Sequence, residues 1–251
     1  MASIFIVRVP GWRTLVIQTP ESWHLFDSAV HWYRRTMRSR LFREIERGND
    51  QQALKFATRR RLAWSRGEWG ETPLRAAISH GRSELACELI RRGGVRPKDG
   101  ALASAAASGD MKIVQALLAA GKNPDEPFPE NELHGMTPLM YATNRGHLEV
   151  MQALLAAGAN IDAVDDSGTS AAMHARSGTP GHLRALEVLL PYKPDIHQQD
   201  DRKRNLIREA IDRYRCSDKP AMLLLLKAHY PEIDFDAYLA SMIAHSENNQ
   251  R

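Results

Sequence analysis

The sequence is poor in cysteine and lacks long apolar runs. Its 251 residues include two cysteines, Cys87 and Cys216, which are too few for a disulfide framework and too far apart for a zinc-type pair. We expect both thiols to be reduced and to fill small core positions. The apolar start at 4–7 is interrupted by Arg8 and Pro10, so it is too short for a secretory or membrane-spanning segment. We therefore expect a soluble, cytoplasmic protein.

Catalytic and metal-binding patterns are missing as well. None of the ten histidines pairs with another at the helical i, i+4 spacing or joins a cysteine cluster. The glycines are spaced as residues that end helices rather than as a phosphate-binding loop, and no nucleophile–base arrangement is recognisable. We expect no enzymatic activity, no metal and no cofactor.

Charge is small in sum but uneven along the chain. The formal net charge is +4, yet residues 34–66 hold ten arginines against three acidic residues. Acidic residues gather further on, in loops that precede predicted helices: Asp125, Glu126, Glu130, Glu132, Asp162, Asp165 and Asp166. A partner would therefore meet two different faces.

The first forty residues differ from the rest. Two apolar, β-branched runs at 4–9 and 14–18 flank a Pro-Gly-Trp turn and predict a β-hairpin. A lone hairpin is marginal in water, so it must pack on the helix predicted after Pro20, pair with another chain, or not form. All five tryptophans lie in the first seventy residues, and we expect 1–40 to be a separate N-terminal extension.

From residue 41 onward, one pattern recurs. Turn glycines fall at Gly48, Gly81, Gly109, Gly146 and Gly181, and the apolar pairs 56–57, 89–90, 117–118, 154–155 and 189–190 move with them. The Thr-Pro-Leu sequence at 72–74 returns at 137–139, and 168–172 is a degraded copy. Threonine is a good N-cap and proline suits the first helical position. Each segment therefore predicts two short helices whose apolar stripe needs a neighbour to bury it.

These residues resemble the ankyrin repeat family, whose unit is a β-turn followed by two antiparallel helices at a period near 33 residues. The resemblance implies an all-α, ankyrin-type solenoid of about five helix–turn–helix units over 41–251. The predicted units are 41–66, 67–97, 98–131, 132–164, 165–199 and 200–234, with a C-terminal helix at 235–246.

The pattern departs from the family at several places. The loop between Gly93 and Leu102 is about three residues short, and the acidic segment 125–132 is about four too long. Arg75 and Met140 stand where the family usually has histidine after Thr-Pro-Leu. His147 and His182 follow turn glycines, where we expect a structural role.

The resemblance also implies that the chain binds another protein through loop tips and inner helices that line a concave groove. Carried over position by position, the candidate contact residues are Trp69, Glu71, Ser79, His80, Leu133, His134, Met136, Asn144, Arg145, Asp166, Ser167 and Thr169. Trp69, Leu133 and Met136 would be exposed apolar anchors. In the alternative interpretation, Trp69 fills the shortened neighbouring loop and Met136 packs against Leu133.

The long loop offers a further candidate contact. Phe128 lies between Pro127 and Pro129, and rigid prolines around an apolar residue suit a side chain presented to a partner. A tolerated insertion without function explains the same sequence. The acidic loops suggest a basic partner, with this chain as its inhibitor, immunity protein or adaptor, and we favour a monomer.

Nucleic-acid binding is the rival function. Arg59, Arg60 and Arg61 with Trp64 combine phosphate-binding cations with a ring that can stack on bases. The simpler interpretation is a solvated helix end with Trp64 packed on the next repeat.

Overall fold

The computed structural model describes residues 5–7, 15–17, 40–59, 62, 67, 71–128, 135–175, 180–217, 221–238 and 240. All five tryptophans and the helix predicted after Pro20 lie outside these residues. Within the two predicted apolar runs, strands β1 (Phe5–Val7) and β2 (Leu15–Ile17) pair in antiparallel register, with Ile6 opposite Val16.

The remaining described elements are mostly short helices that come in pairs. Their bounds are α2 (Arg40–Arg47) with α3 (Asp50–Phe56), α5 (Pro73–Ser79) with α6 (Ser83–Arg91), α7 (Ala101–Ser108) with α8 (Met111–Ala119), α9 (Pro138–Arg145) with α10 (Leu148–Ala156), α11 (Ala171–His174) with α12 (Pro180–Leu189), and α13 (Leu206–Ser217) with α14 (Ala221–His229). A 3₁₀ turn, η2 (Leu190–Tyr192), continues α12. Residues 235–238 are helical, at the start of the predicted C-terminal helix.

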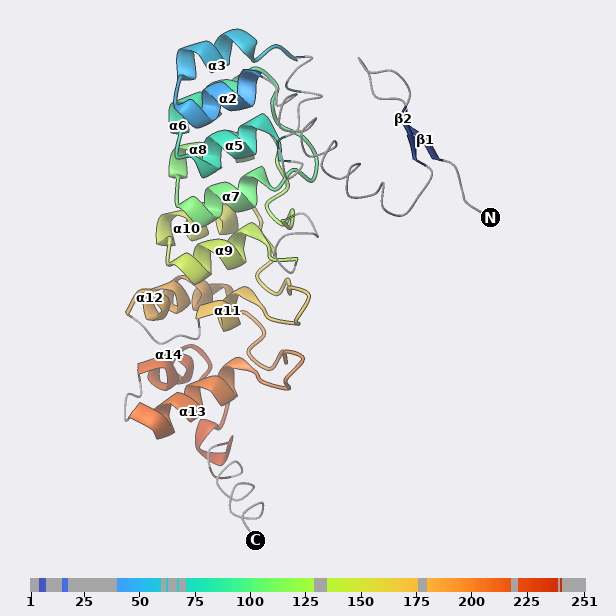
Figure 1. Ribbon diagram of the computed structural model, residues 1–251. Helices are drawn as coiled ribbons and strands as arrows, with labels where there is room; N and C mark the ends of the chain where they lie inside the picture. Colours follow the sequence, from blue (N-terminus) through green and yellow to red (C-terminus); the bar gives the residue numbers. More distant parts are fainter. Residues whose placement is uncertain are drawn as a thin grey trace.

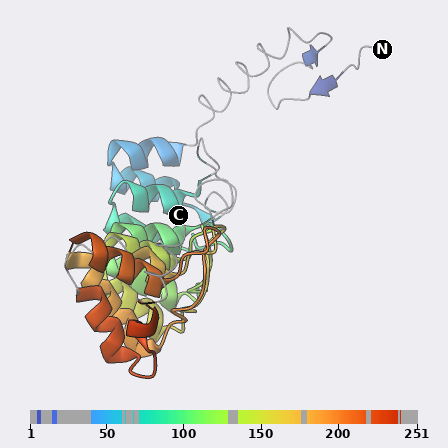
Figure 2. The same cartoon turned by 90° about the horizontal axis from the view of Figure 1, so that it is seen from below.

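The pairs stack in sequence order along one axis (Figure 1). The first helices of successive pairs pack on each other from α2 through α5, α7 and α9 to α11, and we call these and α13 the inner helices. The second helices pack from α3 through α6, α8, α10 and α12 to α14, and we call these the outer helices. Figure 2, seen from below, shows the same two layers. The predicted all-α solenoid is confirmed.

The helices begin and end at the predicted residues, with one exception. Gly48, Gly81, Gly109 and Gly146 turn the chain between paired helices with φ of 76°, 67°, 73° and 73°, a left-handed conformation that glycine adopts without strain. Thr137 caps α9 by accepting from the amide of Met140, and Pro138 occupies the first helical position. Gly181 is the exception, because it lies inside α12, which begins at Pro180. The prediction of a turn there was wrong.

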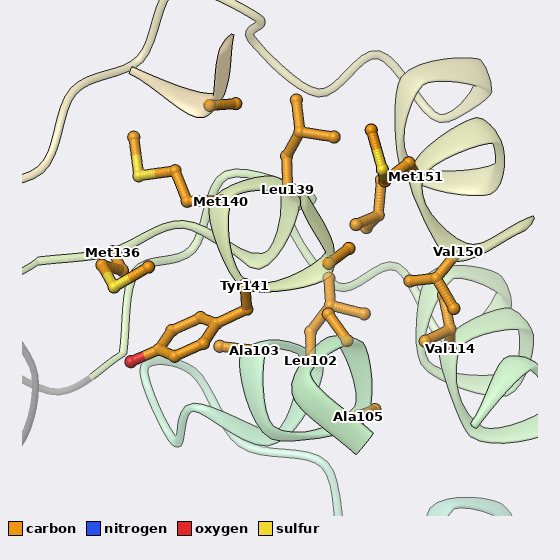
Figure 3. Packing of buried hydrophobic residues seen from close by; sticks show 14 of the residues in the cluster. Leu102, Ala103, Ala105, Val114, Met136, Leu139, Met140, Tyr141, Val150 and Met151 are labelled. Atoms are coloured by element: carbon orange, nitrogen blue, oxygen red, sulfur yellow. The ribbon is translucent and has the colours of Figure 1, made fainter. Parts of the chain in front are cut away.

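The core runs the whole length of the stack. Leu154 is fully buried and Leu155 is 7% exposed, so the pair that closes α10 belongs to the core. In Figure 3, Leu102 of α7, Leu139 of α9, and Val150 and Met151 of α10 lie in the interior shared by adjacent pairs. Each pair completes its apolar interior with side chains from its neighbours, which is how a repeat array is stabilised.

Candidate functional site

The loops that lead into the inner helices project to one side of the stack, on the right in Figure 1. We call each loop a finger and name it after the helix that follows it. The four used below are the α7 finger (95–100), the α9 finger (123–137), the α11 finger (159–170) and the α13 finger (194–205). They carry most of the predicted contact residues.

A backbone hydrogen bond closes the base of each long finger. The amide of Asp165 donates to the carbonyl of Thr169 at 3.1 Å, and Asp200 donates to Arg204 at 2.9 Å. In the α9 finger the equivalent bond runs from Phe128 to Met136 at 3.1 Å. It closes a loop four residues longer than the others, so the extra residues predicted at 125–132 fall between 128 and 136 in the sequence.

The α7 finger is correspondingly short. Gly100 caps α7 only seven positions after Gly93, whereas Ser170 caps α11 twelve positions after Gly158. The shortening is therefore five residues rather than the predicted three. Gly100 takes φ of 68° to make this tight entry to the helix, a conformation that favours glycine.

Phe128 fills space beside the shortened finger. Its ring lies under the Arg75 guanidinium of α5, 5.0 Å from the carbon at its centre, and 5.9 Å from the Tyr141 ring of α9. These partners come from the two inner helices that flank α7, and Phe128 is half-buried. Phe128 therefore packs on its two neighbouring repeats, and its role as a partner contact stays a prediction.

A buried ionic cluster ties the same two fingers together. The Lys122 ammonium lies 2.7 Å from Asp99 Oδ1 and 2.5 Å from Glu126 Oε1, and it donates to the carbonyl of Arg96 at 2.6 Å. The side chains of Lys122 and Asp99 are both 3% exposed. Because three acceptors surround the ammonium, the cost of burying its charge is offset by direct partners.

The α11 finger is held by one carboxylate. Asp165 Oδ1 accepts from the amides of Ser167 and Thr169, both at 2.9 Å. Its other oxygen lies 3.1 Å from His174 Nε2. This buried aspartate therefore shapes the finger and is not offered to a partner.

Asp200 does the same in the α13 finger. Its Oδ1 accepts from the amides of Arg202 and Arg204, and its Oδ2 accepts from Arg204 Nε and Nη2 at 2.9 and 2.7 Å. Burial, the largest single influence, raises the pKa of this carboxyl, but the hydrogen bonds from Arg204 and Arg202 together lower it below its ordinary value.

Two further carboxylates join successive fingers. Asp125 Oδ1 accepts from the amide of Asn160 at 2.7 Å, and Asp162 Oδ1 accepts from the amide of Asp195 at 2.8 Å. Much of the acidic charge that suggested a basic partner therefore serves the framework. Asp166 of the α11 finger and Asp201 of the α13 finger are exposed.

Several predicted contact residues are exposed at equivalent places. Ser79 and His80 precede Gly81 at the end of α5, and Asn144 and Arg145 precede Gly146 at the end of α9; all four are exposed. The remaining predicted residues on this surface are Asp166 and Ser167, which are exposed, and Glu71, which is half-buried.

Other predicted contact residues are not on the surface. Met136 is 9% exposed and Thr169 is 8% exposed, so the expectation that they are surface positions was wrong. Met136 and Tyr141 belong to the same buried cluster (Figure 3), and Thr169 closes the α11 finger base. Trp69, Leu133 and His134 lie outside the described residues.

The structure adds little support for the alternative, nucleic-acid binding, because it describes only one of the four predicted residues. Arg59 is exposed, and Arg60, Arg61 and Trp64 lie outside the described residues. Among the residues with described positions, no group of histidine, cysteine or acidic side chains could hold a metal ion. No helix in the described part is both long and apolar enough to cross a membrane.

Sequence reasoning found the fingers but missed the groups that join them. His147 was expected to be structural, and its Nε2 lies 3.2 Å from the carbonyl of Ala107 in the preceding repeat. Lys122 was not singled out. The sequence did contain a signal for Lys122. This lysine directly follows Gly121, whereas the residues at the corresponding positions of other repeats are the small Gly94 and Ala159.

The stacked helix pairs and projecting fingers define a helical repeat protein. Residues 102–200 match the family model of ankyrin repeats (3 copies). The predicted resemblance is thereby confirmed over residues 102–200, which match ankyrin repeats.

Solved structures agree on the fold. An ankyrin repeat domain from Acinetobacter baumannii AYE is similar with a TM-score of 0.60 and 23% identity, over 74% of this chain and 96% of that one. The ankyrin repeat protein EF0377 is similar with a TM-score of 0.62 and 20% identity, over 73% of this chain and 96% of that one. No curated protein matches the chain in sequence.

Proposed function

We propose that this chain is a non-enzymatic module that binds another protein through its finger tips and the exposed ends of its inner helices. The observation that carries the proposal is the exposure of Ser79–His80 and Asn144–Arg145 at equivalent positions of α5 and α9. Ankyrin repeats are in general protein-interaction modules, and function concentrates on loops held by a rigid scaffold.

Asn144 and Arg145 are the best residues to test. Both are exposed, and within the described part of the chain neither side chain makes a hydrogen bond or an ion pair. Arginine near the centre of an interface is often among the residues whose truncation costs most binding energy. The framework does not need these two side chains, so their loss should leave the fold intact.

The finer roles suggested by the sequence, inhibitor, immunity protein or adaptor, belong to this proposal. Exposed charge on the α11 and α13 fingers is mixed, with Asp166 and Asp201 beside Arg202 and Lys203. A partner with charges of both signs would complement them. This replaces the simpler expectation of a basic partner.

The test is quantitative affinity capture followed by measurement of Kd with the recombinant partner. We compare the wild type with Asn144→Ala/Arg145→Ala, and with a control, Glu149→Ala/Gln152→Ala, that changes two exposed residues of outer helix α10. The first variant should weaken binding by about tenfold or more, since each lost hot-spot contact costs more than about 1 kcal/mol. Equal affinity for all three proteins would rule out this surface.

A further inference from the structure

The α7 finger is shorter than the corresponding loops of other repeats, and the α9 finger is longer. These two altered fingers are joined through Lys122. One finger is five residues short and the next is four residues longer than the α11 finger. Phe128 of the long finger reaches Arg75 and Tyr141 on either side of α7. The α9 finger thus fills the space that the shortened α7 finger leaves open.

Lys122 is the group shared by both fingers. It contacts Asp99 and the carbonyl of Arg96 in the α7 finger, and Glu126 in the α9 finger. Asp99 in turn accepts from the amides of Arg96 and Ala101, both at 3.1 Å, and so sets the path of the α7 finger into its helix. The strength of this cluster depends on its burial, because an ion pair in water contributes little.

We propose that the α7 finger and the described parts of the α9 finger, residues 123–128 and 135–137, form one cooperative unit, latched by Lys122, which opens and closes as a whole. If the Glu126 carboxylate moves away from the Lys122 ammonium, water reaches the Lys122–Asp99 ion pair and weakens it. If the Asp99 carboxylate moves away, the Lys122 ammonium loses one of its acceptors and binds Glu126 less strongly. A contact made at either finger therefore changes the stability of the other. This inference concerns the free chain and does not depend on the proposed binding function.

Hydrogen exchange followed by NMR tests the proposal on the full chain. The reporters are the amides of Arg96 and Ala101, which donate to Asp99, and the amide of Phe128, which donates to Met136. In the wild type, these amides should share one opening free energy, as residues of a single cooperative unit do. Glu126→Ala should accelerate all three by about tenfold or more, since charged hydrogen bonds are lost.

The control variant is Glu149→Ala, which removes an exposed carboxylate of α10 and should change none of the three amides. Lys122→Met removes the shared group and should accelerate both fingers together. Faster exchange at Phe128 alone in Glu126→Ala would overturn the proposal. Equal acceleration of amides throughout the stack, including those of α13, would also overturn it, because the cluster would then support the whole fold rather than two fingers.

Discussion

Gly109 carries a constraint that Gly121 does not. A methyl group added there would lie 2.6 Å from the nearest ring atom of His147, whereas one added at Gly121 would meet nothing within 4 Å. Both glycines have positive φ, 73° and 80°. An alanine at Gly121 would therefore suffer backbone strain alone, whereas an alanine at Gly109 would suffer the same strain and a clash with His147.

We expect Gly109→Ala to cost more stability than Gly121→Ala. A left-handed alanine costs roughly 1–2 kcal/mol, and this applies at both sites. At Gly109 the displaced imidazole also loses its contact with the carbonyl of Ala107, which adds about 1 kcal/mol. Urea unfolding checks the difference. In a His147→Ala background the two substitutions should cost the same, and an undiminished difference would contradict the explanation.

Tyr230 predicts a loss of stability at alkaline pH. Its hydroxyl donates to the carbonyl of Pro194 at 2.6 Å. Burial, followed by the nearby charges of Asp162, Glu232 and Asp195, raises the pKa of this phenol to about 12. In the unfolded chain a tyrosine titrates near pH 10, so between about pH 10 and 12 the unfolded state binds fewer protons and stability falls as pH rises.

Tyr230→Phe should remove this part of the alkaline slope. At neutral pH the variant should be about 1 kcal/mol less stable, because the hydrogen bond to Pro194 is lost. Unfolding curves between pH 7 and 12 provide the measurement. Tyr192→Phe, at a tyrosine that is 52% exposed, serves as the control and should keep the wild-type slope. A Tyr230→Phe protein with an unchanged slope would assign the alkaline loss to other groups.

At the scale of elements, the Lys122 cluster predicts an unequal response to single and multiple substitutions. Lys122→Met leaves Asp99 and Glu126 buried without their cation and should cost about 3–5 kcal/mol, as when one partner of a buried ion pair is removed. Adding Asp99→Asn and Glu126→Gln removes the stranded charges and should restore part of that loss. Chemical denaturation measures both. A triple variant less stable than Lys122→Met would contradict this account.

The sequence predicted the helix pairs because their determinants are local and repeat in one register. A threonine cap with proline after it, a glycine at the turn and a leucine pair each act within one or two helical turns. Gly181 misled because Gly181–His182 looks like Gly146–His147, whereas the proline before it begins a helix. The contacts of Phe128 with Arg75 and of Lys122 with Asp99 were not predicted, because the partners are distant in sequence and the contacts require two loop lengths to change together.

The predicted contact surface was only partly foreseeable for a similar reason. Asn144 and Arg145 are exposed as position in the repeat implied. Met136 is buried because the finger base closes through its carbonyl and its side chain joins the core. A position-by-position comparison treats every finger as equal in length, so it fails where the α9 finger differs.

At the scale of the whole molecule, stability should depend on where a repeat lies in the stack. Leu154 and Leu226 are both fully buried, but α10 packs between α8 and α12, whereas α14 packs on α12 and on α13. Leucine-to-alanine changes in a core cost about 2–5 kcal/mol. Leu154→Ala should therefore lower the stability of the whole stack, since its central interfaces are coupled.

Leu226→Ala should instead loosen mainly the α13–α14 pair. Limited proteolysis with mass spectrometry should find early cleavage within 206–229 in Leu226→Ala and none there in Leu154→Ala below its unfolding midpoint. Circular dichroism should give one transition for Leu154→Ala and a broader, earlier onset for Leu226→Ala. The same sharp transition in both variants would mean that the stack unfolds as one unit.

The matched lengths of the α7 and α9 fingers limit how this array could be rebuilt. Repeat proteins are commonly lengthened, shortened or recombined by whole units, since each unit contacts only its neighbours. Here Phe128, in the unit at 98–131, contacts Arg75 in the unit before and Tyr141 in the unit after. A graft or deletion of one unit would leave an unfilled space or a displaced loop. Residues 67–164 would have to be transferred together, as a triple-length module.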